Sequence, residues 1–169
     1  MQPLKRILLI VAILIACVGC DQTTKSLARD YLQDRGTVSF LGDTLRLQYA
    51  ENPGAFLSLG SSLPRPWRAA AFTIGGILMI TAVLLYAFLY RKSGRIQIVA
   101  LSLICGGGIG NLIDRVRYDG HVTDFLNMGV ASIRTGIFNV ADVMLMAGVA
   151  LIVLRYRRSP PSVDTSRVP

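Results

Sequence analysis

Long uncharged apolar runs alternate with short polar segments along the chain. Three of these runs cover residues 69–90, 96–113 and 135–154, and the last is interrupted only by Asp142. They are 22, 18 and 20 residues long. Because an α-helix rises about 1.5 Å per residue, each run is long enough to cross about 30 Å of hydrocarbon. The pattern therefore predicts three membrane-spanning helices in this part of the chain.

An earlier apolar run, residues 7–20, is shorter and supports two interpretations. It follows two basic residues and ends in small ones, as a secretory signal peptide does, so that Cys20 would begin a mature lipoprotein. Alternatively, the run belongs to an uncleaved first span whose outer end carries Asp21 and Lys25, an i, i+4 pair of favourable orientation. The three later spans exclude a soluble lipoprotein body and favour the second interpretation.

Composition and charge agree with a membrane protein. The 169 residues are 52% hydrophobic with a mean hydropathy of +0.50, which is too apolar for an ordinary soluble domain. Nine of the 18 Lys and Arg residues lie in short segments that would share one side of the membrane, and Asp164 is the only acid there. The net charge of +8 therefore lies on one face, the positive-inside pattern of cytoplasmic segments. No nucleic-acid partner is expected.

The expected fold is an α-helical polytopic membrane protein with four transmembrane helices and both termini in the cytoplasm. The spans are predicted at about residues 5–27, 67–90, 96–114 and 136–155, with outer loops at 28–66 and 115–135. A single membrane-embedded domain is expected to cover residues 1–158, followed by a disordered cytoplasmic tail at 159–169.

The two outer loops carry strand and turn signals. Residues 45–49 alternate between apolar and polar side chains after a Gly-Asp turn, which predicts a small hairpin on the membrane surface. In the second loop, Asp119-Gly120 is a strong two-residue turn signal, so the chain is expected to turn there and return toward the membrane.

A glycine cluster lies in the third span, in the sequence CGGGIG. Gly106 and Gly110 have the small-x-x-x-small spacing that lets membrane helices approach closely, and no phosphate-loop signature accompanies them. The cysteines, including the pair Cys17 and Cys20, are interpreted as small helix residues rather than a redox site. With His121 as the single histidine, no metal site is expected.

Two aspartates carry the strongest chemical signal. Asp142 precedes 12 uncharged residues, about 18 Å of helix, so it lies below the outer membrane surface, where an ionisable group indicates a functional site. Asp124 follows the predicted turn on a segment that returns toward it. Such a pair can activate water as in aspartic proteases, or carry protons or cations, and spacing alone does not separate these. A structural ion pair of Asp142 with Arg115 or Lys25 is a further interpretation.

Other polar residues are expected around this pair. Asn139, three residues before Asp142, is expected on the same helix face. Arg115 can hold a carbonyl or acidic group with its forked donors. The expected polar ring also includes Asn52, Asn111 and Asp114.

Five segments in order then match the motifs of one family. They are DQTTK at 21–25, ENPGAF at 51–56, GGIGNLIDR at 107–115, GHVTDF at 120–125 and FNVAD at 138–142. The chain, apart from its tail, resembles bacterial lipoprotein signal peptidase, also called signal peptidase II. One departure is that the family commonly has N-x-G-A-A-F, whereas the aromatic residue of the second motif here comes one position earlier.

The resemblance implies an inner-membrane aspartic endopeptidase with a small periplasmic β-cradle and its active site toward the periplasm. It would cut diacylglyceryl-modified prolipoproteins just before the lipidated cysteine, as a monomer without metal or other cofactor, and globomycin-type inhibitors would act on it. By motif, the catalytic pair would be Asp124 and Asp142. The substrate pocket would be shaped by Asn52, Gly54, Asn111, Arg115 and Asn139. Structural roles would fall to Asp21, Lys25 and Asp114.

Two alternatives remain open from the residues themselves. A proton-coupled carrier would also use intramembrane carboxylates, but it should show polar residues through the middle of several spans, and the second and third spans are nearly free of them. A lipoprotein with a cleaved leader would lose the first helix.

Overall fold

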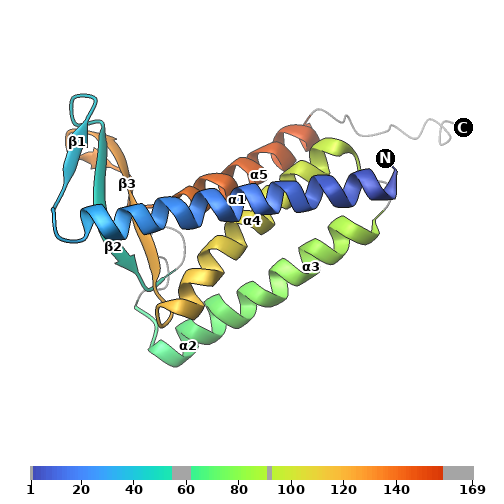
Figure 1. Ribbon diagram of the computed structural model, residues 1–169, viewed down its shortest axis with the longest axis horizontal. Helices are drawn as coiled ribbons and strands as arrows, with labels where there is room; N and C mark the ends of the chain where they lie inside the picture. Colours follow the sequence, from blue (N-terminus) through green and yellow to red (C-terminus); the bar gives the residue numbers. More distant parts are fainter. Residues whose placement is uncertain (1, 55–61, 91–92, 158–169) are drawn as a thin grey trace, which may run out of the picture.

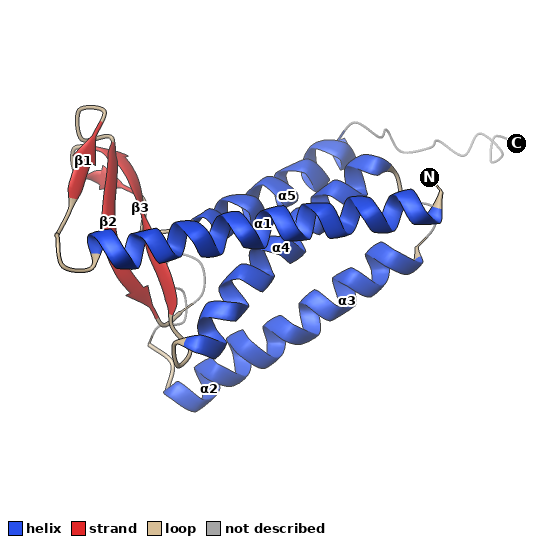
Figure 2. Cartoon of the chain, viewed as in Figure 1, coloured by secondary structure: helices blue, strands red, loops and turns tan. Residues whose placement is uncertain are grey.

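The computed structural model describes residues 2–54, 62–90 and 93–157. Its helices are α1 (Pro3–Leu32), α2 (Arg65–Ala69), the π-helical segment η2 (Ala70–Ile74), α3 (Gly75–Leu89), α4 (Arg95–Arg117) and α5 (Val140–Arg157). Its strands are β1 (Val38–Phe40), β2 (Leu45–Asn52), β3 (Val122–Val130) and β4 (Ile133–Arg134). The sheet lies at one end of the helices, and the start of α1 and the end of α5 lie at the other (Figures 1 and 2).

Three helical stretches within the described residues are long and apolar enough to cross a membrane. They are Pro3–Leu32, Pro66–Leu89 and Arg95–Arg117, which confirms the prediction of long apolar helices. The second combines α2, η2 and α3, and its π-helical segment was not expected from the sequence. Helix α5 has 18 residues but contains three charged ones, Asp142, Arg155 and Arg157.

Helix α1 is longer than the apolar run that it contains. It continues without a break through Cys20 for 30 residues. Lys25 Nζ lies 2.9 Å from Asp21 Oδ2, and both side chains are fully buried. The prediction that this polar pair belongs to the first helix is therefore confirmed. Cys17 and Cys20 are free thiols on the same helix, in agreement with their interpretation as helix residues.

Helix α4 is the central helix, and its glycines let three neighbouring helices approach closely. A Cβ on Gly106 would lie 2.5 Å from an atom of α1, one on Gly107 2.3 Å from the Ala141 carbonyl oxygen of α5, and one on Gly108 3.0 Å from an atom of α3. Consecutive residues point about 100° apart around a helix, so each glycine faces a different partner. Gly110 faces α1 again, which confirms the packing prediction for Gly106 and Gly110.

Replacing Gly107 by Ala is expected to destabilise the bundle by about 1–3 kcal/mol, because the backbone of α5 blocks the new methyl group. The matched control is Gly19→Ala, since a Cβ there would have no neighbour within 4 Å. Its unfolding midpoint should be unchanged or slightly raised. Thermal unfolding of both variants in detergent micelles measures the difference, and equal midpoints would contradict the close α4–α5 contact.

The strands form one antiparallel sheet in the order β1-β2-β3-β4. This confirms the hairpin predicted around residues 45–49. Asp119 and Gly120 have φ values of 54° and 87°, so the predicted turn is also present. It joins helix α4 to strand β3 rather than two strands, because the helix continues to Arg117.

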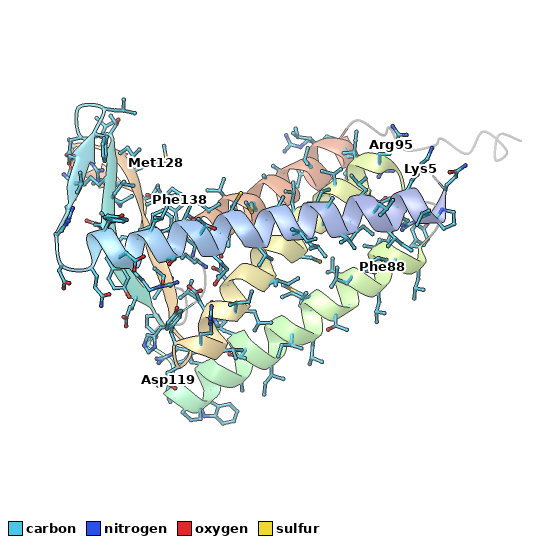
Figure 3. All side chains as sticks on the ribbon, in the orientation of Figure 1. Lys5, Phe88, Arg95, Asp119, Met128 and Phe138 are labelled. Carbon is cyan, nitrogen blue, oxygen red and sulfur yellow. The ribbon has the colours of Figure 1, made fainter. Side chains whose placement is uncertain are left out.

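The half of the sheet that contains β1 has one apolar and one polar face. Residues paired across antiparallel strands share a face. The pairing therefore groups Val38, Phe40, Leu45, Leu47, Leu126 and Met128 on one face, and Ser39, Arg46 and Asn127 on the other. Asp124 lies two residues before Leu126 on β3 and belongs to the apolar face. This face looks toward the helices, and Figure 3 shows Met128 and Phe138 on that side.

Candidate active site

Helix α5 begins at Val140, later than the residue 136 expected from the apolar run. The preceding segment is still extended, because Phe138 forms an isolated bridge with Leu126 of β3. Asn139 therefore stands directly before the helix and caps it. Its Oδ1 accepts a hydrogen bond from the Asp142 N–H at 3.0 Å, and Asp142 Oδ2 accepts one from the Asn139 N–H at 3.2 Å. The prediction that Asn139 shares a helix face with Asp142 is wrong.

Both aspartates are buried and each accepts two hydrogen bonds from N–H donors. Asp142 Oδ1 accepts from Asn111 Nδ2 at 2.9 Å, in addition to the backbone donor of Asn139. Asp124 Oδ2 accepts from Asn52 Nδ2 at 2.8 Å and its Oδ1 from Asn139 Nδ2 at 2.6 Å. Asn139 thus contacts both aspartates and joins the strand to the helix.

The surroundings of Asp124 favour its protonated form. Burial raises the pKa of this carboxyl to about 7, and the charge of Asp142 adds to the rise. The hydrogen bonds from Asn52 and Asn139, together with the Lys25 charge, act in the opposite direction. Asp124 therefore holds a proton into the neutral pH range, which is what a water-activating pair of carboxyls requires of one member.

Asp142 forms no ion pair with Lys25 or Arg115 within the part of the chain that the structure describes. Lys25 instead lies 2.9 Å from Asp21 Oδ2 and 3.4 Å from Asp114 Oδ2. The structural ion pair considered from the sequence is therefore not formed, and the carboxylate of Asp142 is held by neutral amides.

Asp21 and Asp114 each hold the backbone next to one of the two aspartates. Asp21 Oδ1 accepts the N–H of Ala141 at 3.0 Å, one residue before Asp142. Asp114 Oδ2 accepts the N–H of Thr123 at 2.9 Å, one residue before Asp124. Asp21 of α1 and Asp114 of α4 therefore help to fix the positions of the start of α5 and the start of β3 relative to each other.

Arg115 lies beside this cluster and binds the loop after β2. Its Nη2 donates to the Gly54 carbonyl at 2.9 Å, which confirms that its fork holds a carbonyl group. The loop is also turned by Asn52, whose Oδ1 accepts the Gly54 N–H at 2.8 Å. The last two residues of the second motif, Ala55 and Phe56, lie outside the described residues.

A cavity of about 450 Å³ lies between η2–α3 and the helices α4 and α5. Its polar wall contains Asn111, Arg115 and Asp142, and its apolar wall includes Phe72, Met79, Ile80 and Leu145. A mostly apolar cavity with a few convergent polar groups is typical of a substrate site. Asp142 therefore lies at the polar end of a site that suits an apolar segment.

A sequence model of the signal peptidase (SPase) II family matches residues 13–158. The chain belongs to this family. Signal peptidase II is an aspartic peptidase, so the resemblance of the five motifs is confirmed and the carrier interpretation is excluded.

Similar members of the signal peptidase II family cover most of the chain. A lipoprotein signal peptidase of Sulfurihydrogenibium sp. is 31% identical over 152 residues, covering 88% of this chain and 91% of that relative. One of Bifidobacterium adolescentis is 35% identical over 161 residues, covering 92% and 80%. A solved bacterial membrane enzyme, determined by the in meso method at 2.3 Å resolution, has a TM-score of 0.79 and 26% identity, covering 95% and 94%.

The structure of this signal peptidase II family member brings all ten residues singled out from the motifs into one connected cluster. Two further residues, Gln22 and Arg29, contact this cluster and were not expected from the sequence. Gln22 Nε2 donates to Asp114 Oδ1 at 3.0 Å and to the Gly110 carbonyl at 3.1 Å. Arg29 Nη1 donates to Thr123 Oγ1 at 2.7 Å. Gln22 lies within the first motif, and that position was the one available signal for it.

Proposed function

We propose that this chain is a multi-pass enzyme of the bacterial inner membrane that cuts diacylglyceryl-modified prolipoproteins just before the lipidated cysteine. Removal of lipoprotein signal peptides is the activity of its family. Asp124 and Asp142 are the proposed catalytic pair. The observation that carries this assignment is the pair of buried carboxyls joined through Asn139, with Asp142 on the wall of an apolar cavity.

The proposed mechanism divides the work between the two carboxyls. Asp142 accepts a proton from a water molecule, and that water attacks the carbonyl carbon of the residue before the lipidated cysteine. Asp124 carries the shared proton and polarises the carbonyl oxygen. The proton then passes to the leaving amine as the peptide bond breaks. The raised pKa of Asp124 supports its part as proton carrier.

The cavity between η2–α3 and α4–α5 supports the proposed path of the substrate. Its apolar side chains suit the hydrophobic part of a signal peptide, which enters from the lipid. Its polar end carries Asn111, Arg115 and Asp142, so a peptide bond placed there would meet the catalytic pair. In this proposal Asn52, Gly54, Asn111, Arg115 and Asn139 shape the pocket.

The arrangement of the elements supports four spans, with α5 as the fourth and both termini in the cytoplasm. The start of α1 and the end of α5 lie together, opposite the sheet (Figure 1). Two described basic residues of the segments expected inside, Lys5 and Arg95, lie at the end of the termini (Figure 3), which agrees with the positive-inside pattern. The sheet would then lie in the periplasm, with its apolar face against the membrane surface. The proposed domain covers residues 1–158, and its tail at 159–169 lies outside the described residues.

The decisive experiment is cleavage of a diacylglyceryl-modified prolipoprotein by the purified chain in detergent. Product should form only from the lipidated precursor, and a globomycin-type inhibitor should abolish it. The unlipidated precursor is the matched control, since it differs only in the modification. Equal cleavage of both precursors would contradict the proposed substrate.

A monomer is proposed because the site residues come from a single chain. Light scattering in detergent measures the oligomeric state.

The rate kcat is expected to fall as pH rises through about 7, because Asp124 then loses the proton that it contributes. An Asn52→Ala variant loses a hydrogen bond that stabilises the ionised form of Asp124, so the pKa of Asp124 should rise. The alkaline limb of the pH–rate profile should then move to higher pH. Gln48→Ala removes an amide from the same strand, away from the aspartates, and should leave the limb in place. A limb that stays or moves to lower pH in Asn52→Ala would refute the assignment.

A further inference from the structure

Lys25 is fully buried, and its ammonium group has three acceptors around it. It lies 2.9 Å from Asp21 Oδ2 and 3.4 Å from Asp114 Oδ2. It also donates to Asn111 Oδ1 at 2.8 Å. These contacts can use all three hydrogens of the ammonium. Lys25 therefore connects both acids that hold the backbone next to the catalytic pair with an amide that touches Asp142.

The contact with Asn111 fixes the orientation of its side-chain amide. An ammonium can only donate hydrogen bonds, so the amide oxygen of Asn111 must face Lys25. The amide nitrogen must then point the other way, where it donates to Asp142 Oδ1 at 2.9 Å. Without the ammonium, the amide oxygen of Asn111 would keep only the 3.1 Å hydrogen bond from Asn139 Nδ2, so its orientation would be less firmly held.

Asn139 is oriented by the same donor and acceptor logic. Its Oδ1 accepts the backbone N–H of Asp142, so its nitrogen faces Asp124 Oδ1 at 2.6 Å and Asn111 Oδ1 at 3.1 Å. The oxygen of Asn111 thus receives both Lys25 and Asn139. The side-chain nitrogens of Asn111 and Asn139 therefore each point at one carboxyl of the proposed catalytic pair.

We propose that Lys25 is a positioning residue for the cleavage reaction, acting through the amide of Asn111 to present a fixed donor to Asp142. This inference rests on the proposed catalytic pair. It changes the expectation from the motifs, which gave Lys25 a structural role alone.

A test must separate the positioning role of Lys25 from its role in neutralising the buried carboxylates of Asp21 and Asp114. Lys25→Met alone would leave two buried carboxylates without their cation, and is expected not to fold. The pair Asp21→Asn with Lys25→Met removes one charge of each sign. Asparagine at position 21 still offers an oxygen to the Ala141 N–H, and Asp114 keeps Arg29 at 4.0 Å. The comparator is Asp21→Asn alone, which retains the ammonium beside Asn111.

The double variant is expected to have a kcat at least about tenfold below that of Asp21→Asn, with KM within about twofold. The alkaline limb of its pH–rate profile should also lie at higher pH. The Lys25 charge lowers the pKa of Asp124, so the loss of that charge should raise this pKa, while Asp142 and Arg115 are the same in both variants. In an Asn111→Ala background, the same loss of Lys25 should change kcat by less than about threefold, because its target is already absent.

Equal kcat values and pH profiles for Asp21→Asn and the double variant would overturn the positioning role. So would an equal effect of Lys25 in both Asn111 backgrounds. Loss of the folded, substrate-binding state in the double variant would assign Lys25 a structural role and would also overturn the inference. None of these outcomes affects the catalytic pair, which fails separately if aspartate variants at 124 or 142 retain normal turnover.

Discussion

Asp142→Asn and Asp124→Asn variants are each expected to cleave a diacylglyceryl-modified prolipoprotein at least about 10⁴-fold more slowly than the unaltered chain. An asparagine amide cannot accept the proton of the attacking water or carry the shared proton through the reaction. Loss of either carboxyl should cost nearly as much as loss of both, because the proposed mechanism uses the two as one unit. Single-turnover cleavage by the purified variants in detergent measures the effect.

The same substitution at an exposed position provides the control. Asp34→Asn changes an exposed carboxyl two residues after the end of α1, which does not line the cavity, and this variant should cleave at the normal rate. Each carboxyl of the proposed pair accepts two N–H donors, one on each oxygen, so the amide nitrogen of an asparagine there would face one of these donors. Binding of a globomycin-type inhibitor and thermal unfolding therefore need to be measured for each variant. Near-normal turnover by either catalytic variant would refute the pair.

The second large effect is expected at Asn139, which touches both carboxyls of the proposed catalytic pair. Asn139→Ala removes the donor to Asp124 and the acceptor for the Asp142 N–H, and kcat should fall by about 10²–10³. It should also destabilise the start of α5 by about 1 kcal/mol, because the helix loses its capping side chain. Kinetics and thermal unfolding of the same preparation measure both effects.

Asn139→Ser separates the two roles of this residue. Serine is a good helix cap, so its unfolding midpoint should stay close to that of the unaltered chain. Its short hydroxyl cannot both cap the helix and reach Asp124, so kcat should stay nearly as low as in Asn139→Ala. A serine variant with near-normal kcat would show that capping alone is what the reaction needs from this position.

Local patterns in the sequence were sufficient for much of the fold. Uninterrupted apolar runs indicate the long helices because a helix satisfies its own backbone hydrogen bonds in lipid. Alternation at residues 45–49 indicates the hairpin, and Asp119-Gly120 indicates the turn, since each depends on neighbours along the chain. The order of the five motifs was enough to predict the family, and these motifs contain the residues that the fold brings together.

Contacts between distant segments could be assigned only after folding. The amide of Asn139 caps α5 instead of lying on its face, because a bridge to Leu126 of β3 holds residue 138 in an extended conformation. Asp21 holds Ala141 and Asp114 holds Thr123, and no local pattern relates the two members of either pair. The glycines show the same division, since small-residue spacing predicts a close approach but the packed bundle decides which helix each one faces.

The pair Asp21 and Lys25 shows most clearly which contacts local sequence patterns can predict and which they cannot. From sequence, Asp21 and Lys25 are an i, i+4 pair at the end of a helix, and that pairing is local and therefore predictable. Their effect on the active site depends on Asn111 and Ala141, which approach only when α1 packs on α4 and α5. A buried charge needs partners, and the tertiary structure decides which groups lie next to it. Packing therefore determines these partners and the chemistry of the site.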